Sequence, residues 1–174
     1  SRDVCNQRFI FNLIKHEMEI KIIVVGKTNS NYLKEGERNY DDRLRHYLSH
    51  SEITIPELKN AKNLTSDQIK TREGELILKQ VLKAHYVVLL DENGQNFTSI
   101  EMSNWMQKRM NAGHKCIVFV VGGAYGFSKD VYTRSDYKLS LSKMTFSHQM
   151  VRLFFKEQLY RAFTILKGEP YHHN

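Results

Sequence analysis

The chain has 174 residues, enough for one globular domain with a sizeable hydrophobic core. Its formal net charge of +7 suits a polyanionic partner such as RNA, although some basic proteins have no such partner. Its two cysteines form no CxxC motif, which argues against a disulfide framework and indicates a reducing, cytoplasmic location. No apolar run is long enough to cross a bilayer, so we expect no membrane association.

The first 17 residues differ in pattern from the rest of the chain. Ser1–Glu17 carries a short, interrupted apolar stretch and no small-residue cleavage site, which is not typical of a signal peptide. Met18 directly precedes a regular strand pattern. We therefore interpret Met18 as the natural start, Ser1–Glu17 as an upstream extension or cloning remnant, and residues 18–174 as a single domain. The alternative is an amphipathic arm that helps to bind RNA.

From residue 20 onward, apolar runs that predict strands alternate with periodic segments that predict helices. The expected strands are 20–25, 53–55, 86–90, 116–121 and 138–142. The expected helices are 32–48, 65–84, 98–113, a short one capped by Ser128, and 149–167, which Gly168 ends. A polar loop is expected at 59–63 and a turn at 91–94. The pattern predicts an α/β fold with a mostly parallel sheet and helices on both faces.

The last predicted helix carries apolar side chains around most of its circumference. A helix of this kind is buried on all sides, which is difficult to achieve at the surface of a small domain. We therefore expect a two-fold homodimer that forms through this helix. The alternative is that the helix lies at the centre of a monomer.

Three strand ends are candidates for a ligand site. The sequence lacks GxGxxG after its first strand, GxxxxGK[ST], GxSxG and HExxH, which weighs against dinucleotide dehydrogenases, P-loop NTPases, α/β hydrolases and zincins. Ligands of open α/β sheets bind beyond the carboxyl ends of the strands. Here those ends are the segment after Leu90, the glycine-rich stretch Gly122–Gly126, and Leu141–Phe146.

Polar residues on the last helix form a second group of candidates. Arg152 and Arg161 are costly on so apolar a helix unless they are paired or face a cleft, where a guanidinium can hold a phosphate. The alternative is that carboxylates such as Glu157 pair with them at an interface. A zinc site built from His148, His172 and His173 matches no usual ligand spacing, and we expect no metal.

Four segments near the C-terminus carry a specific resemblance. They are Leu139–Phe146, His148–Arg152, Glu157–Ala162 and Gly168–His172, and Val24–Lys27 and Val121–Gly123 match as well. These segments resemble the SPOUT RNA methyltransferases, and among them the bacterial enzymes that methylate N3 of a pseudouridine in 23S rRNA. The resemblance spans residues 18–172. The chain departs from that family at Ser147, where a proline is usual, and at His173-Asn174, which replaces a basic-acidic ending.

The resemblance implies a C-terminal deep trefoil knot and a homodimer in which each cofactor site lies near the partner subunit. It implies that S-adenosyl-L-methionine contacts Leu90, Gly122, Leu141, Ser142, Lys143, Met144, Thr145 and Phe146. It implies that the target nucleotide faces the four residues His148, Arg161, Tyr171 and His172. His148 and Asp91 are the candidates for a base that removes the N3 proton.

The activity that the resemblance implies is methylation of N3 of a pseudouridine in a 23S rRNA hairpin loop, on the assembled ribosome. One alternative is a SPOUT methyltransferase that acts on tRNA, although the chain has no appended RNA-binding domain. Another is a ribosome-binding factor without catalytic activity, which the intact segment 141–146 argues against.

Overall fold

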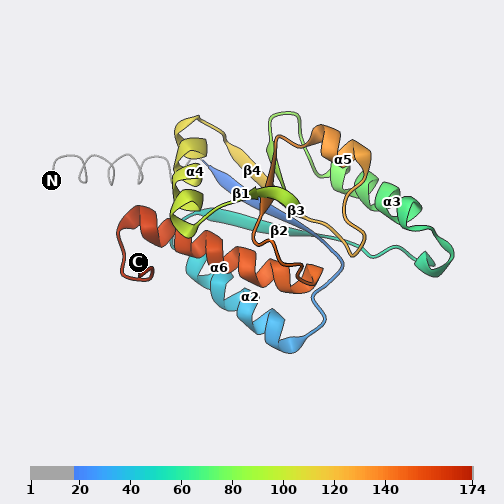
Figure 1. Cartoon of the computed structure of the whole chain (residues 1–174), viewed down its shortest axis with the longest axis horizontal. Helices are drawn as coiled ribbons and strands as arrows, with labels where there is room; N and C mark the ends of the chain where they lie inside the picture. Colours follow the sequence, from blue (N-terminus) through green and yellow to red (C-terminus); the bar gives the residue numbers. More distant parts are fainter. Residues whose placement is uncertain (1–17, 174) are drawn as a thin grey trace.

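The computed structural model describes residues 18–173, so the predicted extension Ser1–Glu17 and residue Asn174 lie outside the described residues. The described chain folds into a parallel sheet with strand order β2-β1-β4-β3-β5 and helices on both faces (Figure 1). This arrangement confirms the predicted α/β class. The strands are β1 (Glu19–Val25), β2 (Ser49–Ile55), β3 (Tyr86–Asn96), β4 (Cys116–Val121) and β5 (Tyr137–Ser140).

The position of each strand in the sheet explains its composition. β4 is the central strand, and every one of its residues is buried because helices cover both faces. β2 is an edge strand with several exposed polar side chains. The sequence predicted only 53–55 of β2, because the polar residues that precede Ile53 hide the strand pattern, as is usual at a sheet edge.

Three helices cover one face of the sheet and two cover the other (Figure 1). α6 packs between α2 and α4 on the first face, where its Phe155 ring lies 4.6 Å from that of Phe119 in β4. Burial of a side chain such as Phe155 contributes roughly 1.5–3 kcal/mol. None of the described helices is long and apolar enough to span a lipid bilayer. The helices are α2 (Asn31–Leu44), α4 (Ser99–Asn111) and α6 (His148–Lys167) on the first face, and α3 (Ser66–Lys79) and α5 (Lys129–Arg134) on the second.

The helix ends follow the predicted capping signals. Thr65 and Thr98 form complete capping boxes at the starts of α3 and α4. α6 begins at His148, and the Ser147 hydroxyl accepts a hydrogen bond from the backbone N–H of Met150 at 3.2 Å. Ser147 thus supplies a side-chain cap at the position where the resembling family has proline. Gly168 ends α6 with a φ of 67°, as predicted.

β3 is the main departure from the predicted elements. The sequence predicted a strand that ends at Leu90 and a turn at 91–94. The structure instead continues β3 to Asn96, but Leu90 and Gln95 both align with Leu139 of β5, so the intervening residues loop out of the ladder. Gly94 permits this bulge, because a Cβ atom there would lie 2.7 Å from the backbone of Leu139. Residues 45–48 and 80–84 lie outside α2 and α3, although the predicted helices included them.

A buried ionic cluster joins the middle of α6 to α2 and β2. The Lys156 Nζ atom lies 2.8 Å from a Glu52 carboxylate oxygen and 2.9 Å from one of Asp41, and Glu37 lies 3.7 Å away. The side chain of Lys156 is almost entirely buried. Although burial opposes its charge, Glu52 and Asp41 raise the pKa of Lys156 above its usual value, so it stays charged.

The apolar surface of α6 is largely covered by its own chain. Gly36 of α2 lies so close to Leu153 that a Cβ atom there would be 2.9 Å from the leucine side chain. An open strip remains around Phe154, which is 36% exposed and packs against the 37%-exposed Phe146 with ring centroids 5.0 Å apart. This strip is available for the predicted subunit contact.

Candidate functional site

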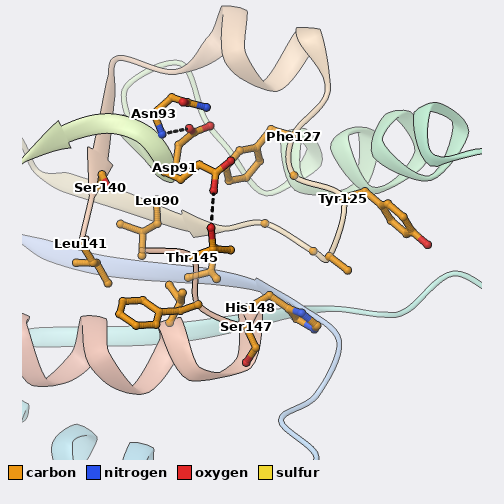
Figure 2. A pocket seen from close by; sticks show the side chains of 18 of the residues that line it. Leu90, Asp91, Asn93, Tyr125, Phe127, Ser140, Leu141, Thr145, Ser147 and His148 are labelled. Atoms are coloured by element: carbon orange, nitrogen blue, oxygen red, sulfur yellow. Dashed lines mark hydrogen bonds between the residues drawn. The ribbon is translucent and has the colours of Figure 1, made fainter. Parts of the chain in front are cut away.

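A cavity of about 580 Å³ lies at the carboxyl ends of β3, β4 and β5 (Figure 2). Its walls come from the three strand-end segments that the sequence singled out, and seven of the eight predicted cofactor residues line it. Lys143, which is exposed, does not line it. The predicted residues at the cavity are Leu90, Gly122, Leu141, Ser142, Met144, Thr145 and Phe146.

The floor of the cavity follows β4. Gly123 and Gly126 close a tight turn, in which the Gly126 N–H donates to the Gly123 carbonyl at 3.2 Å and Gly126 has a φ of 82°. Gly122 packs on a ring, since a Cβ atom there would lie 3.1 Å from Phe127. The glycines therefore leave the backbone of this turn open to a ligand at the cavity wall.

The β3 bulge brings carboxylates to the opposite wall (Figure 2). Asp91 accepts a hydrogen bond from the Asn93 N–H at 2.8 Å and a short one from the Tyr132 hydroxyl. Both oxygens of Asp91 therefore already accept a hydrogen bond from within the chain. Glu92 accepts a hydrogen bond from the Thr145 hydroxyl at 3.2 Å, which joins the bulge to the loop after β5.

The loop after β5, residues 141–147, covers the cavity on the side of α6. Within it, the Ser142 hydroxyl accepts a hydrogen bond from the Met144 N–H at 2.9 Å. Met144 is the most exposed large apolar residue of the described chain, at 74%. The hydrogen bond from the Thr145 hydroxyl to Glu92 joins this loop to the β3 bulge. The loop therefore closes one side of the cavity.

His148 lies where α6 begins, at the edge of the same cavity (Figure 2). Burial lowers the pKa of His148 below its usual value, and the positive charge of Arg152 lowers it further, whereas Glu57 opposes the change. The imidazole is therefore neutral near pH 7 and able to accept a proton.

Arg152 has a structural position. Its side chain is 1% exposed, and its guanidinium donates to the carbonyl oxygens of Val25 at 2.6 Å and Gly26 at 2.9 Å. Arg152 is not among the residues that line the cavity, and its guanidinium donates to backbone carbonyls and not to Glu157. Other carboxylates, those of Glu37, Glu52 and Glu57, favour its charge. Arg152 instead fixes the first turn of α6 to the end of β1.

Arg161, Tyr171 and His172 meet at the other end of α6. The Arg161 guanidinium lies over the Tyr171 ring at 4.7 Å and 3.3 Å from His172 Nδ1. It also donates to Glu157 Oε1 at 2.5 Å, so the carboxylate that the sequence offered as the alternative partner of this arginine does contact it within the chain. Three of the four predicted target-facing residues thus form one cluster.

The cluster does not include His148. Thirteen residues of helix separate His148 from Arg161, which corresponds to about 20 Å at 1.5 Å per residue. The same separation rules out a metal shared by His148 and His172 within one chain. Among residues 18–173, no group of three or more acidic, histidine or cysteine side chains is arranged to hold a metal ion.

Sequence reasoning missed several residues at both places. Tyr132 and Glu92 reach the cavity because α5 and the β3 bulge fold toward it, and no motif in the sequence signals this. Tyr40 of α2 reaches the C-terminal cluster, where its hydroxyl lies 3.2 Å from that of Tyr171. Only the pairing of α2 with α6 in space reveals that contact.

A parallel α/β sheet with a cavity at its strand ends defines a ligand-binding protein of the open-sheet type. A family model described as "Predicted SPOUT methyltransferase" matches residues 18–172, and the chain therefore belongs to the SPOUT methyltransferase family. It is similar to proteins named ribosomal RNA large subunit methyltransferase H. The one from Christiangramia forsetii is 59% identical over 156 residues, which cover 90% of this chain and 99% of that protein.

Further relatives agree with this assignment, and one solved structure has a similar fold. Proteins of the same name from Parabacteroides distasonis and Flavobacterium psychrophilum are each 54% identical over 90% of this chain and 99% of theirs. A crystal structure of a probable methyltransferase from Bordetella pertussis Tohama I has a TM-score of 0.52 at 8% identity. It covers 87% of this chain and 99% of that one, which shows a shared fold alone.

Proposed function

We propose that this chain uses S-adenosyl-L-methionine to methylate N3 of a pseudouridine in a hairpin loop of 23S rRNA, on the assembled ribosome in the cytoplasm. The observation that carries the proposal is the cavity at the ends of β3, β4 and β5, lined by seven of the eight residues that the family resemblance assigns to the cofactor. The names of relatives with at least 54% identity support rRNA as the substrate.

The residues of the cavity fit an adenosyl cofactor. The cavity volume of about 580 Å³ lies within the usual range for small-molecule sites. Gly122 offers backbone approach where a side chain would fill the wall, and Leu90 and Leu141 offer apolar surface. Ser142 and Glu92 add polar groups for hydroxyl or amino functions. When bound, S-adenosyl-L-methionine supplies an electrophilic methyl group on its sulfonium.

We further propose that residues 18–174 act as one domain with the family's trefoil knot, and that the active unit is a two-fold homodimer. His148 and Arg161 lie at equal distances along α6 from a point beside Phe154, the partly exposed ring of the open strip. A two-fold axis at that point would place Arg161 of the partner subunit opposite His148. Each cavity would then combine a first turn of α6 from one subunit with the C-terminal cluster of the other.

Within this arrangement the chain's residues have separate tasks. Arg161, Tyr171 and His172 hold the target nucleotide by charge and stacking, with His173 beside them. His148, neutral near pH 7, accepts the proton that leaves N3. The cavity walls place N3 in line with the methyl group, and such alignment supplies much of the rate enhancement.

The decisive experiment is transfer of tritiated methyl groups to ribosomes that lack the modification, followed by mass spectrometry of the nucleosides. We expect label on a methylated pseudouridine of 23S rRNA. Label on purified tRNA but not on ribosomes would instead support a tRNA-modifying SPOUT enzyme. No binding of S-adenosyl-L-methionine in calorimetry would support a ribosome-binding factor without catalytic activity.

Mixed dimers test the sharing of the site between subunits. His148→Ala and Arg161→Ala homodimers should each be inactive, because every site lacks one residue. Randomly mixed subunits should regain about a quarter of wild-type activity, since half of the dimers are hybrids and each hybrid has one intact site. If the mixture stays inactive while hybrids form, both residues act within one subunit and the proposed arrangement is wrong.

A further inference from the structure

Helices α2 and α6 present a surface in which cationic side chains alternate with tyrosine rings. The Arg43 guanidinium lies 5.6 Å from the Tyr40 ring centroid and 5.5 Å from that of Tyr160. On the same surface, the Arg161 guanidinium lies 4.7 Å from the Tyr171 ring centroid. Interleaved basic and aromatic side chains are typical of surfaces that bind RNA. The family resemblance assigns target binding to residues on the α6 side of this surface. It assigns no role to the residues on the α2 side.

The two arginines of this surface differ in charge balance. Glu157 neutralises Arg161 in an ion pair at 2.5 Å. Arg43 is exposed, and among residues 18–173 it forms no ion pair with a carboxylate; its Nε atom donates only to the neutral amide oxygen of Asn39 at 3.2 Å. Arg43 is therefore a cation of this cluster whose charge is available to an external anion.

The side chain of Arg43 is also restrained. Two tyrosine rings and the bond to Asn39 hold the guanidinium, so less side-chain entropy is lost when it binds an anion. The guanidinium's fixed, planar array of N–H donors matches phosphate geometry. Tyr40 connects this position to the target-binding tail, because its hydroxyl lies 3.2 Å from that of Tyr171.

We propose that Arg43 binds a backbone phosphate of the rRNA next to the target nucleotide, and that Tyr40 and Tyr160 hold it for this contact. The proposal rests on the proposed function, because it assigns the α2 side of the same RNA-binding surface. The contact positions RNA and carries no information about base identity. It therefore affects the affinity for ribosomes and leaves the methyl-transfer step unchanged.

The test is the Arg43→Ala variant of the full chain, assayed for methyl transfer to ribosomes over a range of salt concentrations. We expect the KM for ribosomes to rise about tenfold, as for one lost hydrogen bond to a charged group, with kcat unchanged. The slope of log affinity against log salt should fall by about 1, the value for one phosphate contact. Calorimetric binding of S-adenosyl-L-methionine should not change.

Arg45 offers a matched control. It lies two residues further along, its side chain is 69% exposed, and it forms an ion pair with Asp42 at 2.7 Å. Arg45→Ala removes the same charge from the same region, yet it should change KM less than twofold. Arg43→Lys should keep the salt slope but bind more weakly than wild type, because an ammonium neither stacks nor binds in a bidentate manner.

The outcomes separate this proposal from the proposed function. If wild-type protein methylates ribosomes but Arg43→Ala and Arg45→Ala have equal effects, Arg43 makes no specific contact and the inference is overturned. An effect of Arg43→Ala on kcat alone would also overturn it. If wild-type protein binds ribosomes with a salt slope that depends on Arg43 but transfers no methyl group, the proposed function fails and the phosphate contact stands.

Discussion

The two ends of α6 have the same backbone geometry but opposite tasks. At the first turn, Arg152 is buried and holds the carbonyl oxygens that end β1, so that His148 is fixed at the cavity. At the last turns, Arg161 is half-buried and lies beside the tyrosine and histidine of the tail. The role of an arginine on an apolar helix therefore cannot be predicted from the helix alone, because the elements that pack against it decide that role.

The middle of α6 differs from both ends. Lys156 lies in a closed ionic cluster with Glu52 and Asp41, away from the cavity and from the tail. We therefore expect substitutions at the ends to affect activity and substitutions in the middle to affect folding.

The largest effect is expected at the C-terminal end. Arg161→Ala should lower methyl transfer to ribosomes at least 100-fold, because the target nucleotide loses its charged contact. The mass of the proposed dimer in solution and the calorimetric binding of S-adenosyl-L-methionine should both persist. Activity within threefold of wild type would remove Arg161 from the site.

Lys156→Ala is the corresponding change in the middle of the helix. It leaves Glu52, Asp41 and Glu37 without their shared cation, which should lower the free energy of unfolding by about 3 kcal/mol. Urea denaturation measures this loss. Without urea, where the variant is folded, its affinity for S-adenosyl-L-methionine should equal that of wild type. A weaker affinity would show that the middle of α6 is not purely structural.

Gly122→Val tests the cavity wall that faces the first turn of α6. The new side chain would meet the Phe127 ring, since even a Cβ atom lies 3.1 Å from it, and would push into the cavity. We expect binding of S-adenosyl-L-methionine to weaken about tenfold in calorimetry. Ala84→Val, at an exposed turn far from the cavity, is the control and should bind normally.

The smallest effect concerns the pH dependence of kcat/KM, which we expect His148 in the first turn of α6 to set. A base with a lowered pKa stays neutral as the pH falls through 6.5, so kcat/KM should hold there and fall tenfold per pH unit only below the lowered pKa. Glu57 opposes the lowering, so Glu57→Gln should move this acid limb to lower pH. A limb that moves to higher pH, or no limb at all, contradicts the assignment of His148 as the base.

Much of the fold could be predicted because its signals are local. Thr65 and Thr98 are capping residues whatever else surrounds them, and Gly168 ends α6 because glycine adopts a positive φ without strain. The central strand 116–121 is apolar throughout and can only be buried on both faces. The cavity residues followed too, since parallel strands end at one edge of the sheet.

Other features depended on contacts between distant segments. The β3 bulge forms because Gly94 packs on the backbone of Leu139, and no local rule predicts that neighbour. The partners of Arg152 and the aromatic contacts of Arg43 likewise come from other elements. Residues 49–52 of β2 were missed because hydrogen bonds to β1, not side-chain pattern, make them a strand.

The sequence by itself determined the order of the elements, the helix caps and the set of residues at the strand ends, because each depends on the conformational preferences of a few neighbouring residues. The tertiary structure decided which charges are paired, which are buried and which face an external partner. Those properties depend on distances between side chains far apart in the chain, and electrostatic and packing energies are set by these distances.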